Sequence, residues 1–406
     1  MPWKETELMD LRTQFVAAFE SKLFSMTELC KEYCISRKTG YKWLQRNREG
    51  GAGGLQNQSR ARHSIAHRTP DDVVDAIIAL RKKHPRWGPR KLLAILRSAN
   101  PKVSERLPAP STAGDLLKAA GLVPTRTRRR RPEHPGSHPL VAKEPNDVWC
   151  IDFKGEFKTR DGIWCYPLTV TDAASRYLLA CAGQLSTAHA GAQSALQALF
   201  ELAGLPAAIR SDNGCPFTTS AIGGISRLSV WFTKLGIRHD RTRPASPQDN
   251  GQHERMHRDL KAGTTRPPAA DLAAQQVLFD AFRHEFNHVR PHEALGMQTP
   301  ASIWTPSTRV LPACLPEPDY PGHMLERKVF TQGEFRFLGH RIFLSEVLAH
   351  EKIALDEVAD AVWAIYFYNV LLAKLDQKTM TIVAIKPKPH VDRPSLAADT
   401  GKDVAD

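Results

Sequence analysis

The chain has 406 residues, of which 42% are hydrophobic and 24% charged, values typical of a globular protein with several domains of ~100–200 residues each. Its 56 Lys and Arg residues outnumber 43 Asp and Glu and give a net charge of +13, which attracts polyanions such as nucleic acid. The sequence lacks a run of ~18 apolar residues, an apolar signal segment at Met1–Glu7 and paired cysteine motifs, which excludes a membrane helix and predicts a cytoplasmic protein with reduced thiols.

Residues 1–50 show three short helical patterns, the second of which begins with the capping box Ser25-Met26-Thr27-Glu28. After a break at Cys34-Ile35, Ser36 can cap a third helix, in which Tyr41 and Leu44 suit a core. This arrangement predicts a helix-turn-helix domain. The solvent side of its third helix offers donors for phosphates and base edges, namely Arg37, Lys38, Lys42 and Arg46. A three-helix bundle with a solvated basic face is the alternative.

Four glycines between Glu49 and Leu55 predict a flexible linker, which we place at residues 51–68. A second helical, DNA-binding domain is expected over residues 69–124. Thr69 should cap its first helix, with Pro70 at the first helical position. Its second helix is predicted at Pro89–Arg97, and its third is capped by Ser111 and ends at Gly121.

A basic linker follows over residues 125–145. In it, Arg128, Arg129 and Arg130 can track a phosphate backbone, because counterion release favours such arms. A solubilising linker is the alternative.

Residues 146–305 change to short apolar runs and helical patterns that alternate, which predicts an α/β domain with a mixed sheet. The predicted strands cover residues 148–157, 164–171, 177–182, 207–211 and 237–242. The predicted helices cover residues 188–202, 223–235, a segment from Gln248 that carries Glu254, and 271–289 with Val277, Phe282 and Phe286 in the core.

Prolines from Pro312 to Pro321 mark a linker over residues 306–325. Beyond it, the apolar and alternating runs at 328–344 and 363–385 predict a small antiparallel β-barrel-like domain over residues 326–387. Residues 388–406 read as a flexible tail.

Three carboxylates stand where metal-dependent phosphoryl transfer needs them, because two divalent ions ~4 Å apart require several hard oxygen ligands at one point. Asp152 lies within an apolar strand, Asp212 lies where a strand ends, and Glu254 lies near the start of a helix. Taken alone, Asp212-Asn213-Gly214 is also a turn signal. The nearby acid Asp172 is interpreted as structural.

The chain resembles the DDE transposases of bacterial insertion sequences, which are relatives of retroviral integrases. The matching motifs are Trp149-x-x-Asp152-Phe153, Thr169-Val170-Thr171-Asp172, Ser211-Asp212-Asn213-Gly214, Asn250-Gly251-x-x-Glu254-Arg255 and Phe286-Asn287-x-x-Arg290-Pro291-His292. The spacing 254 − 212 = 42 is longer than in retroviral integrases, and we place the excess in residues 218–226.

This resemblance implies an RNase H-like core in which Asp152, Asp212 and Glu254 are catalytic and hold two Mg²⁺ ions, or Mn²⁺. It implies binding to double-stranded DNA at transposon ends and target, cleavage of the 3′ end, and strand transfer into the target. It also implies a homo-oligomer associated with the bacterial nucleoid.

Helical periodicity places His257, Arg258 and Lys261 on the face of Glu254, where they are expected to contact DNA. Two other functions remain open. His253-Glu254-Arg255-Met256-His257 matches the H-E-x-x-H motif of zinc metalloproteases. The chain can also be a non-catalytic, DNA-binding regulator derived from a transposase.

Overall fold

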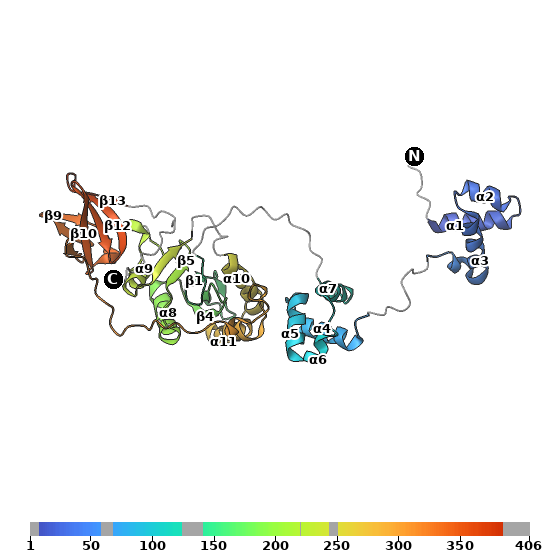
Figure 1. Cartoon of the computed structure of the whole chain (residues 1–406), viewed down its shortest axis with the longest axis horizontal. Helices are drawn as coiled ribbons and strands as arrows, with labels where there is room; N and C mark the ends of the chain where they lie inside the picture. The colour runs from blue at the N-terminus through green and yellow to red at the C-terminus, as the bar shows by residue number, and fades with distance from the viewer. Residues whose placement is uncertain (1–7, 58–67, 124–140, 220, 243–250, 385–406) are drawn as a thin grey trace, which may run out of the picture. The chain divides into compact units, whose positions relative to one another are not determined.

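The computed structural model describes residues 8–57, 68–123, 141–219, 221–242 and 251–384 (Figure 1). The chain divides into two compact units, Met1–Thr69 and Pro70–Asp406. The predicted DNA contacts Arg128, Arg129 and Arg130 and the predicted tail lie outside the described residues. No helix among the described residues is long and apolar enough to cross a membrane. None of the seven cysteines is in a disulfide.

The first unit is a three-helix bundle whose caps follow the sequence prediction. Ser25 forms the predicted capping box, and the side chain of Ser36 accepts a hydrogen bond from the Thr39 backbone N–H. Helices α2 and α3 therefore begin where the hydroxyl caps place them. The bounds of the three helices are α1 Leu8–Glu20, α2 Met26–Glu32 and α3 Arg37–Gly54.

Two predictions for this unit were wrong. Tyr41 is 58% exposed, and the core position beside it belongs to Gly40, where a Cβ would lie 2.9–3.0 Å from Met26, Cys30 and Phe15 side-chain atoms. The predicted linker at residues 49–55 is helical to Gly54, with a kink at Gly51. Leu55 is buried in the bundle core, and this burial holds the segment against the bundle.

The second helical domain packs its helices around the buried residues Ile77, Leu92 and Leu117. Its helix starts differ from the prediction, because Pro70 is extended at the N-cap position of α4 and the helix begins at Asp71. Ser111 lies inside α7, which begins at Pro110, since a proline needs no hydrogen bond at the first helical position. The helices are α4 Asp71–Lys83, α5 Pro89–Ala99, α6 Pro101–Ser104 and α7 Pro110–Ala119.

The α/β domain is built on a six-stranded mixed sheet with the strand order β2-β3-β1-β5-β6, and β4 also pairs with β3. Strand β1 is antiparallel to β3 and parallel to β5, and β5 is parallel to β6. This sheet confirms the predicted mixed α/β core. The strands are β1 Val148–Phe153, β2 Phe157–Lys158, β3 Trp164–Asp172, β4 Leu178–Gln184, β5 Ala208–Ser211 and β6 Arg238–Arg241.

Helices cover both faces of this sheet (Figure 1). One core joins Trp149 and Ile151 to α8 and α9, and the other joins Cys165 and Cys181 to α10 and α11. Val277 is 67% exposed, so its predicted place in the core was wrong, whereas Phe286 is buried. The helices are α8 His189–Ala203, α9 Arg227–Lys234, α10 Gly251–Thr264 and α11 Leu272–His284, continued by the π-helical turn η3 Glu285–Val289.

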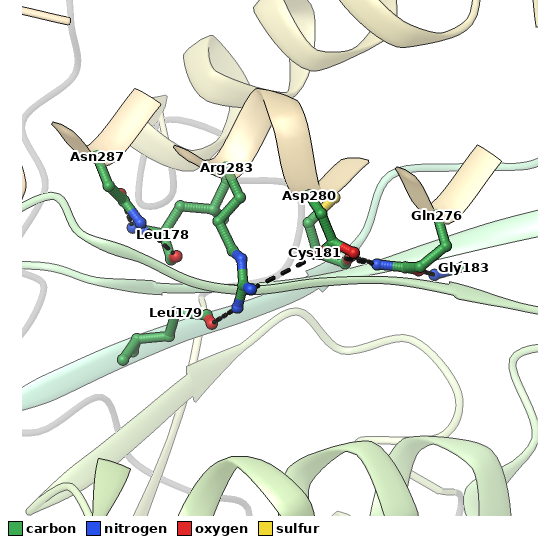
Figure 2. A network of polar contacts seen from close by, with 8 residues as sticks. All are labelled: Leu178, Leu179, Cys181, Gly183, Gln276, Asp280, Arg283 and Asn287. Carbon is green, nitrogen blue, oxygen red and sulfur yellow. Dashed lines mark hydrogen bonds and ion pairs between the residues drawn. The ribbon is translucent and has the colours of Figure 1, made fainter. Parts of the chain in front are cut away.

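Polar side chains of α11 and η3 bind the backbone of β4 (Figure 2). Asn287 accepts a hydrogen bond from the Leu178 N–H and donates one to the Leu178 carbonyl oxygen, at 2.8 and 2.9 Å. Gln276 bonds the Gly183 N–H and the Cys181 carbonyl, both at 2.9 Å, and Arg283 donates to the Leu179 carbonyl at 3.1 Å. These side chains satisfy backbone groups that would otherwise invite pairing with another strand.

The C-terminal domain is an open antiparallel sheet of order β13-β12-β11-β10-β7, with the hairpin β8-β9 beside it. The predicted barrel is not closed, since the end strands β13 and β7 do not pair. The hairpin contributes Phe335, Phe337 and Ile342 to the domain core. The strands are β7 Leu325–Lys328, β8 Glu334–Phe337, β9 His340–Phe343, β10 Lys352–Ala359, β11 Val362–Phe367, β12 Val370–Asp376 and β13 Thr381–Ala384.

Candidate active site

The pairing of β1 with β5 brings Asp152 and Asp212 to one edge of the sheet. The parallel register matches Val148 with Ala208 and Cys150 with Arg210. Continued by two residues, it sets Asp152 beside Asp212, which directly follows the last residue of β5. Carboxyl ends of parallel strands are where α/β sheets build their sites.

Asp212 takes part in a turn and can also offer a ligand atom. Its carboxylate accepts a hydrogen bond from the Gly214 N–H at 3.1 Å, which is the turn that the sequence Asp212-Asn213-Gly214 signals. Asn213 anchors this turn by donating to the Thr242 carbonyl at 2.7 Å. The side chain of Asp212 is nevertheless exposed, so its second oxygen can meet a ligand.

Electrostatics link Glu254 to this pair. Burial, first, and then the charges of Asp212 and Glu254 together raise the pKa of Asp152 from 3.8 to about 7. The Phe153 backbone N–H and the Lys154 ammonium act in the opposite sense. Glu254 lies exposed in the first turn of α10. Asp212 and Glu254 thus each repel the charge of Asp152, and a divalent cation at Asp152 would relieve this repulsion.

Two buried histidines lie directly behind Asp152. The Nε2 atoms of His253 and His257 lie 2.7 and 2.6 Å from the hydroxyl of Thr169, and His253 Nδ1 lies 2.8 Å from the hydroxyl of Thr171. Thr169 Oγ1 also donates to the backbone carbonyl of Asp152 at 3.1 Å. Burial lowers the pKa of His253 to about 3 and of His257 to about 2, so both imidazoles are neutral.

The expectation that His257 faces DNA was therefore wrong, because only 5% of this residue is exposed. Its Nδ1 atom points to Asp152 and lies 3.7 Å from Oδ2. Among the described residues, Asp152, His253 and His257 present possible ligand atoms within 4.8 Å of one another. The sequence Thr169-Val170-Thr171 held a signal for this cluster. Alternate residues of a strand point to one face, so the hydroxyls of Thr169 and Thr171 were bound to lie side by side.

Arg258 and Lys261 lie exposed on the same side of α10 as Glu254. Lys154, which the sequence reasoning missed, is half-buried next to Asp152. Its pKa is lowered first by burial and then by the charge of Lys261, so the two cations are near each other. This side of the acidic site is thus basic, as a surface that receives phosphates should be.

A cavity of about 750 Å³ opens between β1, the first turns of α10 and the segment after α11. Four arginines contribute to its lining, namely Arg176, Arg210, Arg255 and Arg290. Arg176 Nη1 and Arg290 Nε are buried there with no hydrogen-bond partner among the described residues. Buried donors of this kind suit anionic oxygens.

Asp172 occupies a structural position, in agreement with its interpretation from the sequence. It is buried and accepts hydrogen bonds from the Asn146 N–H, the Ser175 N–H and the Ser175 hydroxyl, at 2.7, 2.7 and 2.6 Å. These bonds tie the end of β3 to the start of the domain. His253 also argues against a zinc protease, because threonine hydroxyls occupy both of its ring nitrogens.

On α3 of the first unit, Arg37, Lys38 and Lys42 are exposed, whereas Arg46 is half-buried. The Lys42 ammonium and the Arg46 guanidinium lie over the ring of Trp43, at 5.5 and 5.2 Å from its centroid. Stacking on an aromatic ring fixes long cationic side chains. The predicted recognition helix α3 therefore presents a basic face, and Trp43 holds two of its cationic side chains in place.

Comparison with known families matches four stretches of the chain. Residues 142–247 and 235–300 each match an integrase core domain. Residues 11–63 match a helix-turn-helix domain, and residues 39–116 match a homeodomain-like domain. The matches to the integrase core cover the sheet and helices that carry the three acids.

Individual relatives are similar over different shares of the chain. An uncharacterized 39.2 kDa protein of insertion element IS476 from Xanthomonas euvesicatoria is 26% identical over 277 residues, 67% of this chain and 76% of that protein. The Gag-Pol polyprotein of baboon endogenous virus is 29% identical over 195 residues, 47% of this chain but 11% of the polyprotein, so the chain spans only a small part of it.

The HTLV-2 integrase catalytic core domain, solved in complex with magnesium, is 16% identical with a TM-score of 0.29, over 41% of this chain and 97% of that one. By the family matches, the chain carries an integrase core domain after N-terminal helix-turn-helix domains, and it is distantly similar to an insertion-element protein and to part of a retroviral Gag-Pol polyprotein.

Proposed function

We propose that this protein is a transposase that binds the ends of a mobile DNA element, cleaves the 3′ end and joins it to target DNA. The observation that carries the proposal is the strand register that sets Asp152 beside Asp212, with Glu254 close enough to raise the pKa of Asp152. The similarity to an insertion-element protein supports a mobile element as the DNA.

In this function Asp152, Asp212 and Glu254 offer the hard oxygen ligands that Mg²⁺ or Mn²⁺ prefers, and the raised pKa of Asp152 means that Lys154 alone does not compensate the negative charge there. Two bound ions supply a strong nucleophile and stabilise the leaving oxygen in phosphoryl transfer. Lys154, Arg258 and Lys261 hold the DNA backbone at the acids. Hydrolysis leaves a 3′ hydroxyl on the element. This hydroxyl then attacks a phosphodiester of the target and displaces the bridging 3′ oxygen, which leaves as the 3′ hydroxyl of the cut target strand.

The helix-turn-helix domains select the DNA. Arg37, Lys38 and Lys42 extend from α3 into solvent and are the residues that we assign to the element's terminal repeat. Joining two ends requires two copies of the site, so we propose that the protein acts as a homo-oligomer on paired ends.

Joining of a labelled element end to plasmid DNA in Mg²⁺ tests the catalytic assignment. Asp152→Asn, Asp212→Asn and Glu254→Gln should each abolish joining and leave end binding intact, because each removes a ligand charge without removing volume. Glu201→Gln, which neutralises an exposed acid on α8, is the matched control and should join as wild type does. Wild-type joining by any of the three site variants would remove that residue from the site.

The same assay decides between enzyme and regulator. A wild-type protein that binds its ends tightly but joins no strand in Mg²⁺ or Mn²⁺ would be a DNA-binding regulator. No feature of the described residues favours that function over catalysis.

A further inference from the structure

The hydrogen bonds behind Asp152 fix where the protons of both histidines lie. Thr169 Oγ1 carries one proton and has two lone pairs. Its contact with the Asp152 carbonyl oxygen, at 3.1 Å, takes the proton, because a carbonyl can only accept. The Nε2 atoms of His253 and His257, at 2.7 and 2.6 Å, must therefore each donate to the hydroxyl.

This count leaves one proton on each imidazole, at Nε2, and none at Nδ1. His253 Nδ1 accepts from the Thr171 hydroxyl at 2.8 Å, so all of its bonding capacity is used. His257 Nδ1 keeps a free lone pair, and it faces the carboxylate oxygen Oδ2 of Asp152 at 3.7 Å. Two lone pairs that face each other at this distance repel, and a divalent cation between them would turn the repulsion into attraction.

We propose that His257 Nδ1 and Asp152 Oδ2 bind the same divalent ion, so that the metal site contains one imidazole besides its three carboxylates. This inference rests on the proposed function, which supplies the ion at Asp152. The 3.7 Å separation leaves room for an ion ~2.1 Å from each atom. His253 is not a ligand, although it belongs to the same cluster.

An imidazole ligand changes which ion the site prefers. Mg²⁺ takes oxygen ligands in nearly ideal octahedral geometry, whereas nitrogen ligands favour first-row transition ions. The site should accordingly bind Mn²⁺ and Co²⁺ more tightly than Mg²⁺. The buried hydroxyl of Thr169 orients the ligand ring, as outer hydrogen bonds do for metal-bound histidines in general.

Pulsed electron paramagnetic resonance of the Mn²⁺-loaded full chain tests the ligand directly. The wild type should show the nitrogen coupling of one directly bound imidazole, and replacement of histidine ¹⁴N by ¹⁵N should shift that signal. This measurement needs no variant, so a folding defect cannot obscure it. Mn²⁺ binding without a bound-nitrogen signal would overturn the inference and leave the proposed function standing.

His257→Gln is the matched variant, because a glutamine amide can keep the hydrogen bond to Thr169 while it removes the Nδ1 lone pair. It should lose the nitrogen signal and bind Mn²⁺ ~10-fold more weakly, with a smaller change for Mg²⁺. His253→Gln should keep the signal. Persistence of the signal in His257→Gln would overturn the assignment, and Mn²⁺ that binds equally to wild type and Asp152→Asn would overturn the proposed metal site itself.

Discussion

Asp152→Asn should stabilise the metal-free α/β domain above pH 7, even though it removes the proposed chemistry. Burial, Asp212 and Glu254 raise the pKa of Asp152 from 3.8 to about 7. In the unfolded chain this carboxyl ionises at its usual pKa. Keeping it charged in the folded domain therefore costs about 1.4 kcal/mol per pH unit between the two values, or about 4 kcal/mol in all.

The sign follows from proton binding. A raised carboxyl pKa means that the folded state binds the proton more tightly than the unfolded state does. The contribution of protonated Asp152 to stability is therefore greatest below about pH 4 and is lost as the pH rises to about 7. Asparagine does not ionise. The stability difference between variant and wild type should thus be smallest at pH 4 and should be larger by about 4 kcal/mol at pH 8.

Hydrogen exchange of the β1 and β3 amides, with a chelator present and corrected for the intrinsic rate at each pH, measures this difference for the domain alone. Glu201→Gln, an equal loss of charge at an exposed position, should show no such pH dependence. Saturating Mg²⁺ should stabilise the wild type and not Asp152→Asn. A stability difference that is the same at pH 4 and pH 8 would refute the reasoning.

Four further predictions follow from individual contacts. Mg²⁺ binding should release a proton from Asp152 below about pH 7 and none at pH 9, as calorimetry in two buffers will show. Asn287→Leu should destabilise the domain to urea by about 2–3 kcal/mol, because it leaves both backbone groups of Leu178 unpaired, and a loss under about 1 kcal/mol would contradict this. Gly40→Ala should lower the stability of the first unit by about 1–3 kcal/mol in thermal melts, since its Cβ has no room. Lys261→Ala should weaken binding to every DNA sequence and flatten the salt dependence by about one unit, and an unchanged slope would place this side chain away from the phosphates.

Much of the candidate site was predictable because local patterns specify it. Asp152 stands in an apolar strand and Asp212 at a strand end, and these strand positions need no tertiary information. The position of His257, in contrast, could not be predicted without tertiary information. His257 and Lys261 are four residues apart, which is only ~40° around a helix. The boundary between the buried and the exposed side of α10 runs between them, and the packing of the sheet sets where it runs.

The wrong predictions about the fold also arose where tertiary packing decides the outcome. Tyr41 and Gly40 are neighbours, and the side chains of Phe15, Met26 and Cys30 from other helices decide which of them is buried. Alternation predicted the C-terminal strands but not their pairing, since it says which face is apolar and not whether β13 and β7 meet. The caps Ser25 and Ser36 of the first unit were predicted correctly, whereas the caps Thr69 and Ser111 of the second helical domain and the choices made by distant partners were not.

A metal-specificity switch is the most direct test of the claim that Asp152, Asp212 and Glu254 bind the catalytic ions. Each is replaced in turn by cysteine in the full chain, and joining of a labelled element end is measured in Mg²⁺ and in Mn²⁺. A thiolate is a poor ligand for Mg²⁺ and a better one for Mn²⁺. We expect joining to be lost in Mg²⁺ and partly restored in Mn²⁺ for all three variants, with Glu201→Cys unaffected in either metal. Undiminished joining in Mg²⁺, or no restoration by Mn²⁺ at any of the three positions, would contradict the account.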